Sequence, residues 1–369
     1  MNKNYLVIAV LMSVITLMSC TSSDKEDNVD PNACPAKVYL NLNTSSLTRV
    51  TTDPTNDEKT INGGYACAFD ASGAKIGDVQ HFDSYVSTSK PQINTTTQAS
   101  QISVSANVSS AQTDFASVTK RNLFEGVTTL LANTTSNVQT YNSQDAKKLP
   151  MYGNTTLSFS NNSATPTVNL DHLVYKVQSS SISSNFSNTG YEGATFVPKE
   201  VFLYNANTTC TLDGATGSVP ASGESSDASC AFTATNTSYL SSGAIASYNP
   251  ATPTIYTFYA FPNTTSAPTK LVIKGTFTPS GGTAVTVYYP IVINKYQSNT
   301  RISLDGGSTY INSAQTDDSK VLMNHYYAIS IVINGRGVDH VTDEINPSSA
   351  TVQMLVNGWT SYQQIVTVK

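Results

Sequence analysis

Charged residues are scarce in this chain of 369 residues. Asp, Glu, Lys and Arg together make up 12% of it, and the formal net charge is -5. An average soluble protein has about 25% charged residues. The chain also has no cluster of Lys and Arg, so it lacks the electrostatic footprint of a nucleic-acid-binding protein. Ser, Thr and Asn fill the polar positions, which predicts a surface solvated by hydroxyl and amide groups.

Catalytic and metal-binding motifs are missing as well. The sequence contains no G-x-S-x-G elbow, no P-loop and no G-x-G-x-x-G fingerprint. Its four histidines lack the spacing of metal ligands: His81, His172, His325 and His340. We therefore expect no enzyme activity, no metal and no cofactor. Aromatic residues such as Tyr256–Phe261 and Tyr288-Tyr289 could form a sugar-stacking platform, but strand alternation favours packing in the core.

No apolar run is long enough to span a membrane, because a spanning helix needs about 20 residues. The N-terminal run from Tyr5 to Met18 has fourteen residues and follows Lys3, which makes residues 1–19 a predicted secretory signal. The segment Leu17-Met18-Ser19-Cys20 resembles a bacterial lipobox, so Cys20 is the expected lipid attachment site. The alternative is an ordinary signal with an incidental cysteine. Residues 20–33 follow as a predicted flexible tether.

Cysteines are few, and their number is informative. If lipidation uses Cys20, four of the five remain, which suits an oxidising compartment. Proximity in the sequence favours two of the possible disulfides, Cys34–Cys67 and Cys210–Cys230. The alternative is a metal site or a catalytic thiol, for which no C-x-x-C spacing is present.

Short strands with one buried face dominate the rest of the chain. At 37–42, Val38, Leu40 and Leu42 share one face. Similar patterns, separated by turn clusters, recur at 64–70, 101–108, 157–160, 170–177, 201–204, 255–261, 271–277, 285–293, 325–334 and 350–356. Together with the length, they predict an all-β fold of two β-sandwich domains in tandem, 34–183 and 184–369, with at most a short helix near 113–132 in the first.

Several segments resemble the fimbrillins, the shaft and accessory pilins of Bacteroidetes type V pili. Leu149–Gly153 resembles their P-M-x-G segment. Leu170–Val177 resembles their strand L-x-R-L-V-A-K-V, with His172 and Tyr175 at the usual Arg and Ala positions. Further similar segments are Lys59–Gly73, Tyr256–Asn263 and Asn324–Gly335. The acidic segment Ser22–Asp27 resembles the surface-export signal of lipoproteins from the same group.

The resemblance implies two transthyretin-like β-sandwich domains and assembly by strand exchange. A lipoprotein precursor would reach the surface of the outer membrane, where an arginine-specific protease would cut between Arg49 and Val50. Loss of the first strand, which carries Val38, Leu40 and Leu42, would open an apolar groove for a strand of another subunit. The C-terminal donor candidate contains Ile365, Val366 and Val368.

The expected function is therefore a structural subunit of a surface fimbrium that contributes to adhesion. Its expected partners are other fimbrial subunits, the protease and a host or bacterial surface receptor. Three alternatives stay open: Arg49 is an ordinary loop arginine, the C-terminal strand pairs within its own domain, or the chain is a stand-alone glycan-binding lipoprotein of a nutrient-uptake system. A Cys34–Cys67 bond would keep the cleaved strand tethered, so processing would require its reduction. The alternative is an accessory, tip or anchor subunit whose first strand stays in place.

Overall fold

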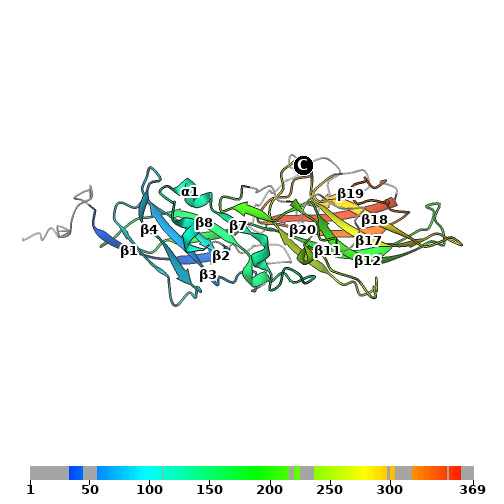
Figure 1. The fold of residues 1–369 in the computed structure, drawn as a ribbon, viewed down its shortest axis with the longest axis horizontal. Coiled ribbons are helices and arrows are strands. Elements are labelled where there is room, and N and C mark those ends of the chain that lie inside the picture. Colours follow the sequence, from blue (N-terminus) through cyan, green and yellow to red (C-terminus); the bar gives the residue numbers. More distant parts are fainter. Residues whose placement is uncertain are drawn as a thin grey trace, which may run out of the picture.

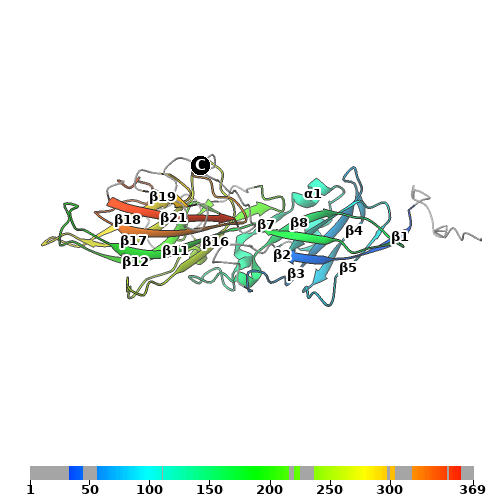
Figure 2. The same cartoon turned by 180° about the vertical axis from the view of Figure 1, so that it is seen from behind.

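Two β-sandwiches lie end to end in an elongated molecule (Figure 1), and Figure 2 shows the same arrangement from behind. The computed structural model describes residues 33–44, 56–109, 111–215, 220–224, 237–296, 300–303, 318–346 and 349–358. The all-β fold with tandem sandwiches is confirmed. The helix expected near 113–132 is confined to α1, Arg121–Glu125, flanked by 3-10 turns.

The N-terminal sandwich consists of a three-stranded and a six-stranded sheet. The smaller sheet has the order β5 (Gln92–Thr96), β1 (Pro35–Tyr39) and β9 (Ser163–Ala164). The larger has the order β2 (Asn41–Thr44), β10 (Thr167–His172), β8 (Met151–Thr156), β6 (Gln101–Ala106), β3 (Gly63–Phe69) and β4 (Lys75–Asp83). Most neighbours are antiparallel, but β1 is parallel to β9 and β2 is parallel to β10.

The C-terminal sandwich follows the same plan with a different strand order. Its five-stranded sheet has the order β16 (Tyr256–Ala260), β11 (Tyr175–Ser184), β20 (His325–Ile333), β21 (Ala350–Gly358) and β19 (Thr300–Ser303). Its three-stranded sheet has the order β12 (Thr195–Tyr204), β17 (Lys270–Thr278) and β18 (Val285–Val292). Two short ladders complete the fold: β13 (Ala206–Asn207) with β15 (Pro220–Ala221), and β14 (Thr209–Thr211) with β7 (Thr128–Leu130).

The chain passes from one sandwich to the other between β10 and β11. The sequence predicted a single strand over 170–177, but β10 ends at His172 and β11 begins at Tyr175. The two residues between them, Leu173 and Val174, are also buried. The apolar run therefore continues across the crossing without a turn signal. Among the described strands, β11 pairs with β16 and β20 of the five-stranded sheet.

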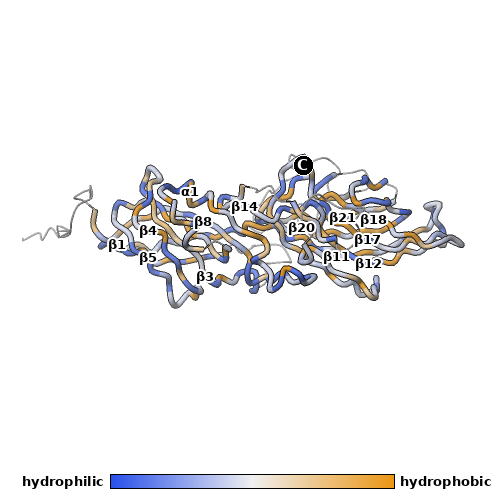
Figure 3. Tube along the Cα trace, viewed as in Figure 1, coloured by the Kyte–Doolittle hydropathy of each residue, from blue (hydrophilic) through white to orange (hydrophobic). Residues whose placement is uncertain are grey.

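Buried side chains form two large clusters, separated by the six-stranded sheet. Figure 3 shows hydrophobic residues recurring along the strands of both sandwiches. The N-terminal core lies between the two sheets of the first sandwich and contains Val38, Leu40, Leu42, Ala66, Ala68, Ile93, Ile102, Val104, Met151, Val168 and Leu170, among others. The shared core joins both sandwiches and includes Tyr65, Cys67, Phe69, Phe115, Phe124, Tyr175, Leu203, Phe258 and Tyr327.

Candidate functional site at the first strand and the domain junction

The first strand crosses from one sheet of the N-terminal sandwich to the other. Its β1 portion lies between β5 and β9, with Val38 opposite Ile93. Its β2 portion forms the edge of the six-stranded sheet, with Leu42 beside Val168 of β10. Leu40 stands at the crossing, where its N–H donates to the carbonyl oxygen of Pro91 at 3.0 Å. Residues 35–44 are therefore part of both layers, and the predicted strand at 37–42 is confirmed.

One face of this strand fills the N-terminal core. Val38 and Leu40 are 0% exposed and Leu42 is 7% exposed. Pro35 and Lys37 point to solvent, as the alternation predicts. Burying three side chains of this size stabilises a domain by about 5–9 kcal/mol. Without the strand, β5 and β9 would lose their shared neighbour, β10 would become an edge, and Ile93 and Val168 would line an apolar slot.

The chain leaves this strand close to the domain junction and returns there. Thr44, the last residue of β2, lies opposite Leu170, two residues before the end of β10. The description resumes at 56, and Glu58 contacts His172. The predicted processing residues Arg49 and Val50 lie outside the described residues. So do Cys20, Cys230 and the donor candidates Ile365, Val366 and Val368.

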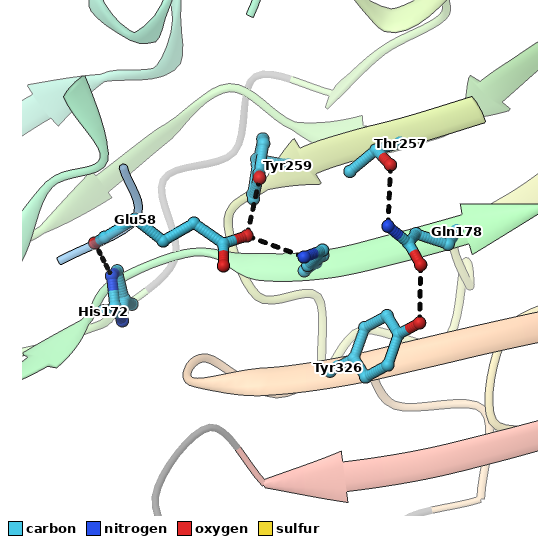
Figure 4. A network of polar contacts seen from close by, with 7 residues as sticks. Glu58, His172, Gln178, Thr257, Tyr259 and Tyr326 are labelled. Carbon is cyan, nitrogen blue, oxygen red and sulfur yellow. Dashed lines mark hydrogen bonds and ion pairs between the residues drawn. The ribbon is translucent and has the colours of Figure 1, made fainter. Parts of the chain in front are cut away.

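Glu58 is a buried carboxylate that links the two sandwiches. It is 1% exposed, and its Oε1 accepts hydrogen bonds from Lys176 Nζ of β11 and Tyr259 OH of β16, each at 2.7 Å (Figure 4). Burial, followed by the nearby Glu58 charge, raises the pKa of the Tyr259 hydroxyl above its ordinary range, so it donates. The ammonium group of Lys176 also lies 5.4 Å from the ring centroid of Tyr326. A charge this deep is tolerated because it is paired and hydrogen-bonded.

His172 holds the main chain of the same residue. Its Nε2 donates to the carbonyl oxygen of Glu58 at 2.9 Å, which fixes the proton on Nε2. Asn324, just before β20, lies beside the ring, and its Nδ2 donates to Asp171 Oδ1 at 3.0 Å. The imidazole is 0% exposed, and burial lowers its pKa below the ordinary 6.5. His172 is therefore neutral in the folded chain near pH 7 and acts as a structural donor rather than a surface residue.

A glutamine side chain completes the contact between the sandwiches. Gln144, from the loop before β8, accepts from the N–H of Tyr259 at 3.0 Å and donates to its carbonyl oxygen at 2.9 Å. The amide thus imitates a neighbouring strand at the edge of β16. Two side chains of the N-terminal sandwich therefore bind Tyr259: Gln144 bonds to its backbone, and Glu58 accepts a hydrogen bond from its hydroxyl. The ladder between β7 and β14 adds further backbone pairing.

The predicted disulfides are wrong. Cys67 and Cys210 are buried free thiols, so neither Cys34–Cys67 nor Cys210–Cys230 forms. Alternation along β3 gives the reason for the first pair. Ala66 and Ala68 face the N-terminal core together with β1, whereas Cys67 points into the shared core on the opposite face. Proximity in the sequence does not show which face of β3 carries Cys67. Burial raises the pKa of both thiols to about 12, so they are unreactive at neutral pH.

The aromatic residues considered as a sugar platform belong to the core. Tyr256, Phe258, Tyr259, Phe261, Tyr288 and Tyr289 are all at most 8% exposed. A surface hollow of about 540 Å³ beside β17 is lined by lysines and carboxylates. Two of the lysines have partners within the chain: Lys270 Nζ donates to the carbonyl oxygen of Val341 at 3.0 Å, and Lys295 pairs with Glu344 at 3.5 Å.

Within the described ranges, no three His, Cys, Asp or Glu side chains are grouped so that they could hold a metal ion. Nor does the described part of the chain contain a helix of sufficient length and apolar character to cross a membrane.

Sequence reasoning missed the residues of the junction. Glu58 has charged neighbours in the sequence, Asp57 and Lys59, and Asp57 pairs with Lys147 at 3.7 Å on the surface. One feature of the sequence did point to the junction: His172 and Tyr175 stand where the strand pattern L-x-R-L-V-A-K-V has Arg and Ala. Both are fully buried at the crossing between the sandwiches.

The fold is shared with solved structures of a fimbrillin and of proteins described as cell adhesion proteins. A candidate cell adhesion protein of Bacteroides eggerthii DSM 20697 matches with a TM-score of 0.62 and 21% identity, over 90% of this chain and 99% of the other. One from Parabacteroides distasonis ATCC 8503 matches with a TM-score of 0.63 and 17% identity, over 89% and 100%. A fimbrillin of Porphyromonas gingivalis W83 matches with a TM-score of 0.60 and 16% identity, over 89% and 98%.

Neither a protein-family model nor a curated protein matches the sequence. The likeness therefore lies in the fold, at sequence identities of 21% and below. It extends through both sandwiches in each of the three structures. The chain has the tandem β-sandwich fold of the Bacteroidetes fimbrillins and of the adhesion proteins that share it.

Proposed function

We propose that this protein is a structural subunit of a type V fimbrium that is exported as a lipoprotein precursor and assembled by protease-triggered strand exchange. The observation that carries the proposal is the first strand. It fills the slot between β5 and β9, forms the edge beside β10, and buries Val38, Leu40 and Leu42. In sequence it is followed by a segment with one arginine, Arg49, before the chain returns at Glu58.

Strand exchange is physically reasonable at this slot. Removing the strand exposes unpaired backbone groups together with an apolar groove, and an incoming strand restores both hydrogen bonds and burial. Val366 and Val368 are two residues apart, the spacing at which Val38, Leu40 and Leu42 enter the core. The partners that follow from the proposal are other fimbrial subunits and an arginine-specific protease. The polymer would contribute to adhesion at the cell surface.

The free Cys67 thiol excludes one tether between the first strand and β3. A Cys34–Cys67 bond would have tethered residues 33–49 to β3 after cleavage, and this bond is not formed. Reduction of that bond is therefore not required for processing.

Substitution of Arg49 tests the proposal. Purified chain treated with an arginine-specific protease should form SDS-resistant ladders, and Arg49→Ala should abolish them. Arg336→Ala is the matched control, because Arg336 is an exposed arginine paired with Asp339 in a loop of the other sandwich. Ladders that persist in Arg49→Ala would contradict the mechanism. Specific binding on a glycan array without any ladder would favour the stand-alone glycan-binding lipoprotein instead.

A further inference from the structure

The segment that follows the first strand is attached to the molecule by a different set of contacts. Residues 33–44 bond to β5, β9 and β10. Glu58 bonds to Lys176 and Tyr259, which belong to the C-terminal sandwich. Its carbonyl oxygen accepts from His172 at the crossing between the sandwiches.

The next residues are fastened to the body of the N-terminal sandwich. The N–H of Asn62 donates to Asn107 Oδ1 at 2.8 Å, and Asn107 Nδ2 donates to the carbonyl oxygen of Thr60 at 2.7 Å. The carbonyl oxygen of Ile61 accepts from the N–H of Tyr85 at 3.1 Å. Each of these partners lies outside residues 33–44, so each of these bonds survives if the first strand departs.

We infer that Glu58 is an anchor that keeps residues 56–62 docked across the domain junction while residues up to Arg49 leave, so that strand exchange is confined to the first strand. The inference rests on the proposed function. The buried carboxylate then has a mechanical role. After cleavage the chain has a new N-terminus at Val50, and Glu58 keeps residues 56–62 fixed a few residues beyond it. The incoming strand then meets a groove whose junction end has a defined edge.

The chemistry of the cluster fits an anchor rather than a surface contact. The side chain of Glu58 is 0% exposed and that of Lys176 is 12% exposed. A buried pair is costly to break, because separating it leaves a charge without compensation in a poorly solvated site. The neighbouring pair of Asp57 and Lys147 has side chains that are 60% and 54% exposed, and an exposed pair of this kind contributes little. The adjacent carboxylates therefore differ: Glu58 is a buried anchor, and Asp57 is an ordinary surface residue.

Hydrogen exchange, measured by mass spectrometry on the full chain before and after arginine-specific cleavage, tests the anchor. In the wild type, amides of the 56–62 peptide should keep their protection after the first strand has been released. Glu58→Gln should raise exchange in this peptide at least about tenfold after cleavage, because the amide keeps the shape but loses the charge that compensates Lys176. Asp57→Asn is the matched control and should behave as wild type.

The outcomes separate the anchor from the proposed function. If the strand is released and the wild-type 56–62 peptide loses protection with it, or if Glu58→Gln matches Asp57→Asn, the anchor is wrong. If cleavage occurs and the first strand is never released, the proposed function fails. The anchor is then judged on the uncleaved chain, where Glu58→Gln should still exchange faster than Asp57→Asn. The wild-type comparison needs no variant, so misfolding of Glu58→Gln leaves the test intact.

Discussion

Truncation of Leu40 should weaken the precursor while leaving the assembled polymer unchanged. Leu40 is 0% exposed at the point where the first strand passes between the sheets. Leu→Ala at a fully buried site removes three carbon atoms and leaves a cavity, which costs about 3–5 kcal/mol. The N-terminal core is closed on both sides by sheets, so little collapse into the cavity is available. We therefore expect Leu40→Ala to lower the free energy of unfolding of the uncleaved chain by this amount.

Denaturant unfolding of the uncleaved chain measures this loss. Lys37→Ala is the control, because Lys37 lies on the same strand and points to solvent, and it should change the free energy by less than about 0.5 kcal/mol. After cleavage at Arg49, Leu40→Ala should also loosen the strand. A loss of 3 kcal/mol corresponds to binding of the strand that is at least about 100-fold weaker.

The polymer gives the complementary result. Since the proposed mature subunit begins at Val50, polymers formed from Leu40→Ala should have wild-type stability. Either of two results would refute the reasoning: a loss of less than about 1 kcal/mol in the precursor, or a polymer whose stability falls with that of the precursor. The first would mean that the strand does not hold the core together, and the second that it remains in the assembled subunit.

Two other substitutions test the junction and the six-stranded sheet. The pKa of His172 is lower in the folded chain than its ordinary 6.5, so unfolding takes up a proton as the pH falls below 6.5. Stability should then decline by up to about 1.4 kcal/mol per pH unit. His172→Gln should flatten that decline between pH 7.5 and 5 in denaturant titrations, and an unchanged slope would assign it to other groups. Gly153→Ala should lower the melting temperature, because a Cβ on β8 would stand 2.0 Å from the carbonyl oxygen of Asn169 on β10. Overpacking of this kind costs about 1–3 kcal/mol or more. The exposed neighbour Asn154→Ala should melt like wild type, and equal melting of both variants would show that the two strands separate easily.

Most of the predicted strands coincide with observed ones, but the one predicted at 157–160 is wrong, because β8 ends at Thr156. The predicted strand at 101–108 is β6, Gln101–Ala106, and the one at 285–293 is β18, Val285–Val292. At 170–177 the predicted single strand is two strands, because the chain crosses between the sandwiches at Leu173 and Val174, which are buried and apolar and therefore look like part of a strand. No Gly, Pro or other turn residue marks the break between the two strands.

The candidate site was predictable in part, for the same reason. Val38, Leu40 and Leu42 were found because their own spacing places them on one face. Glu58 was not, because its role depends on partners 118 and 201 residues away along the chain. The cysteine pairing failed on a similar point. Residues of β3 face the two cores alternately, so Cys67 lies on the face opposite to Ala66 and Ala68. The packing of distant strands decides which of these faces meets β1.

The division into two cores explains how a subunit could lose a strand and keep its architecture. The first strand contributes to the N-terminal core, and its buried residues Val38, Leu40 and Leu42 lie there with Ala66 and Ala68 of β3. The opposite face of β3 faces the shared core, which binds the two sandwiches together. The six-stranded sheet thus separates the apolar groups that strand exchange would expose from those that hold the domains in place. A loss of about 5–9 kcal/mol of burial would fall on the first core alone. In the proposed exchange, the incoming strand would have only to refill that core, because the junction would stay closed.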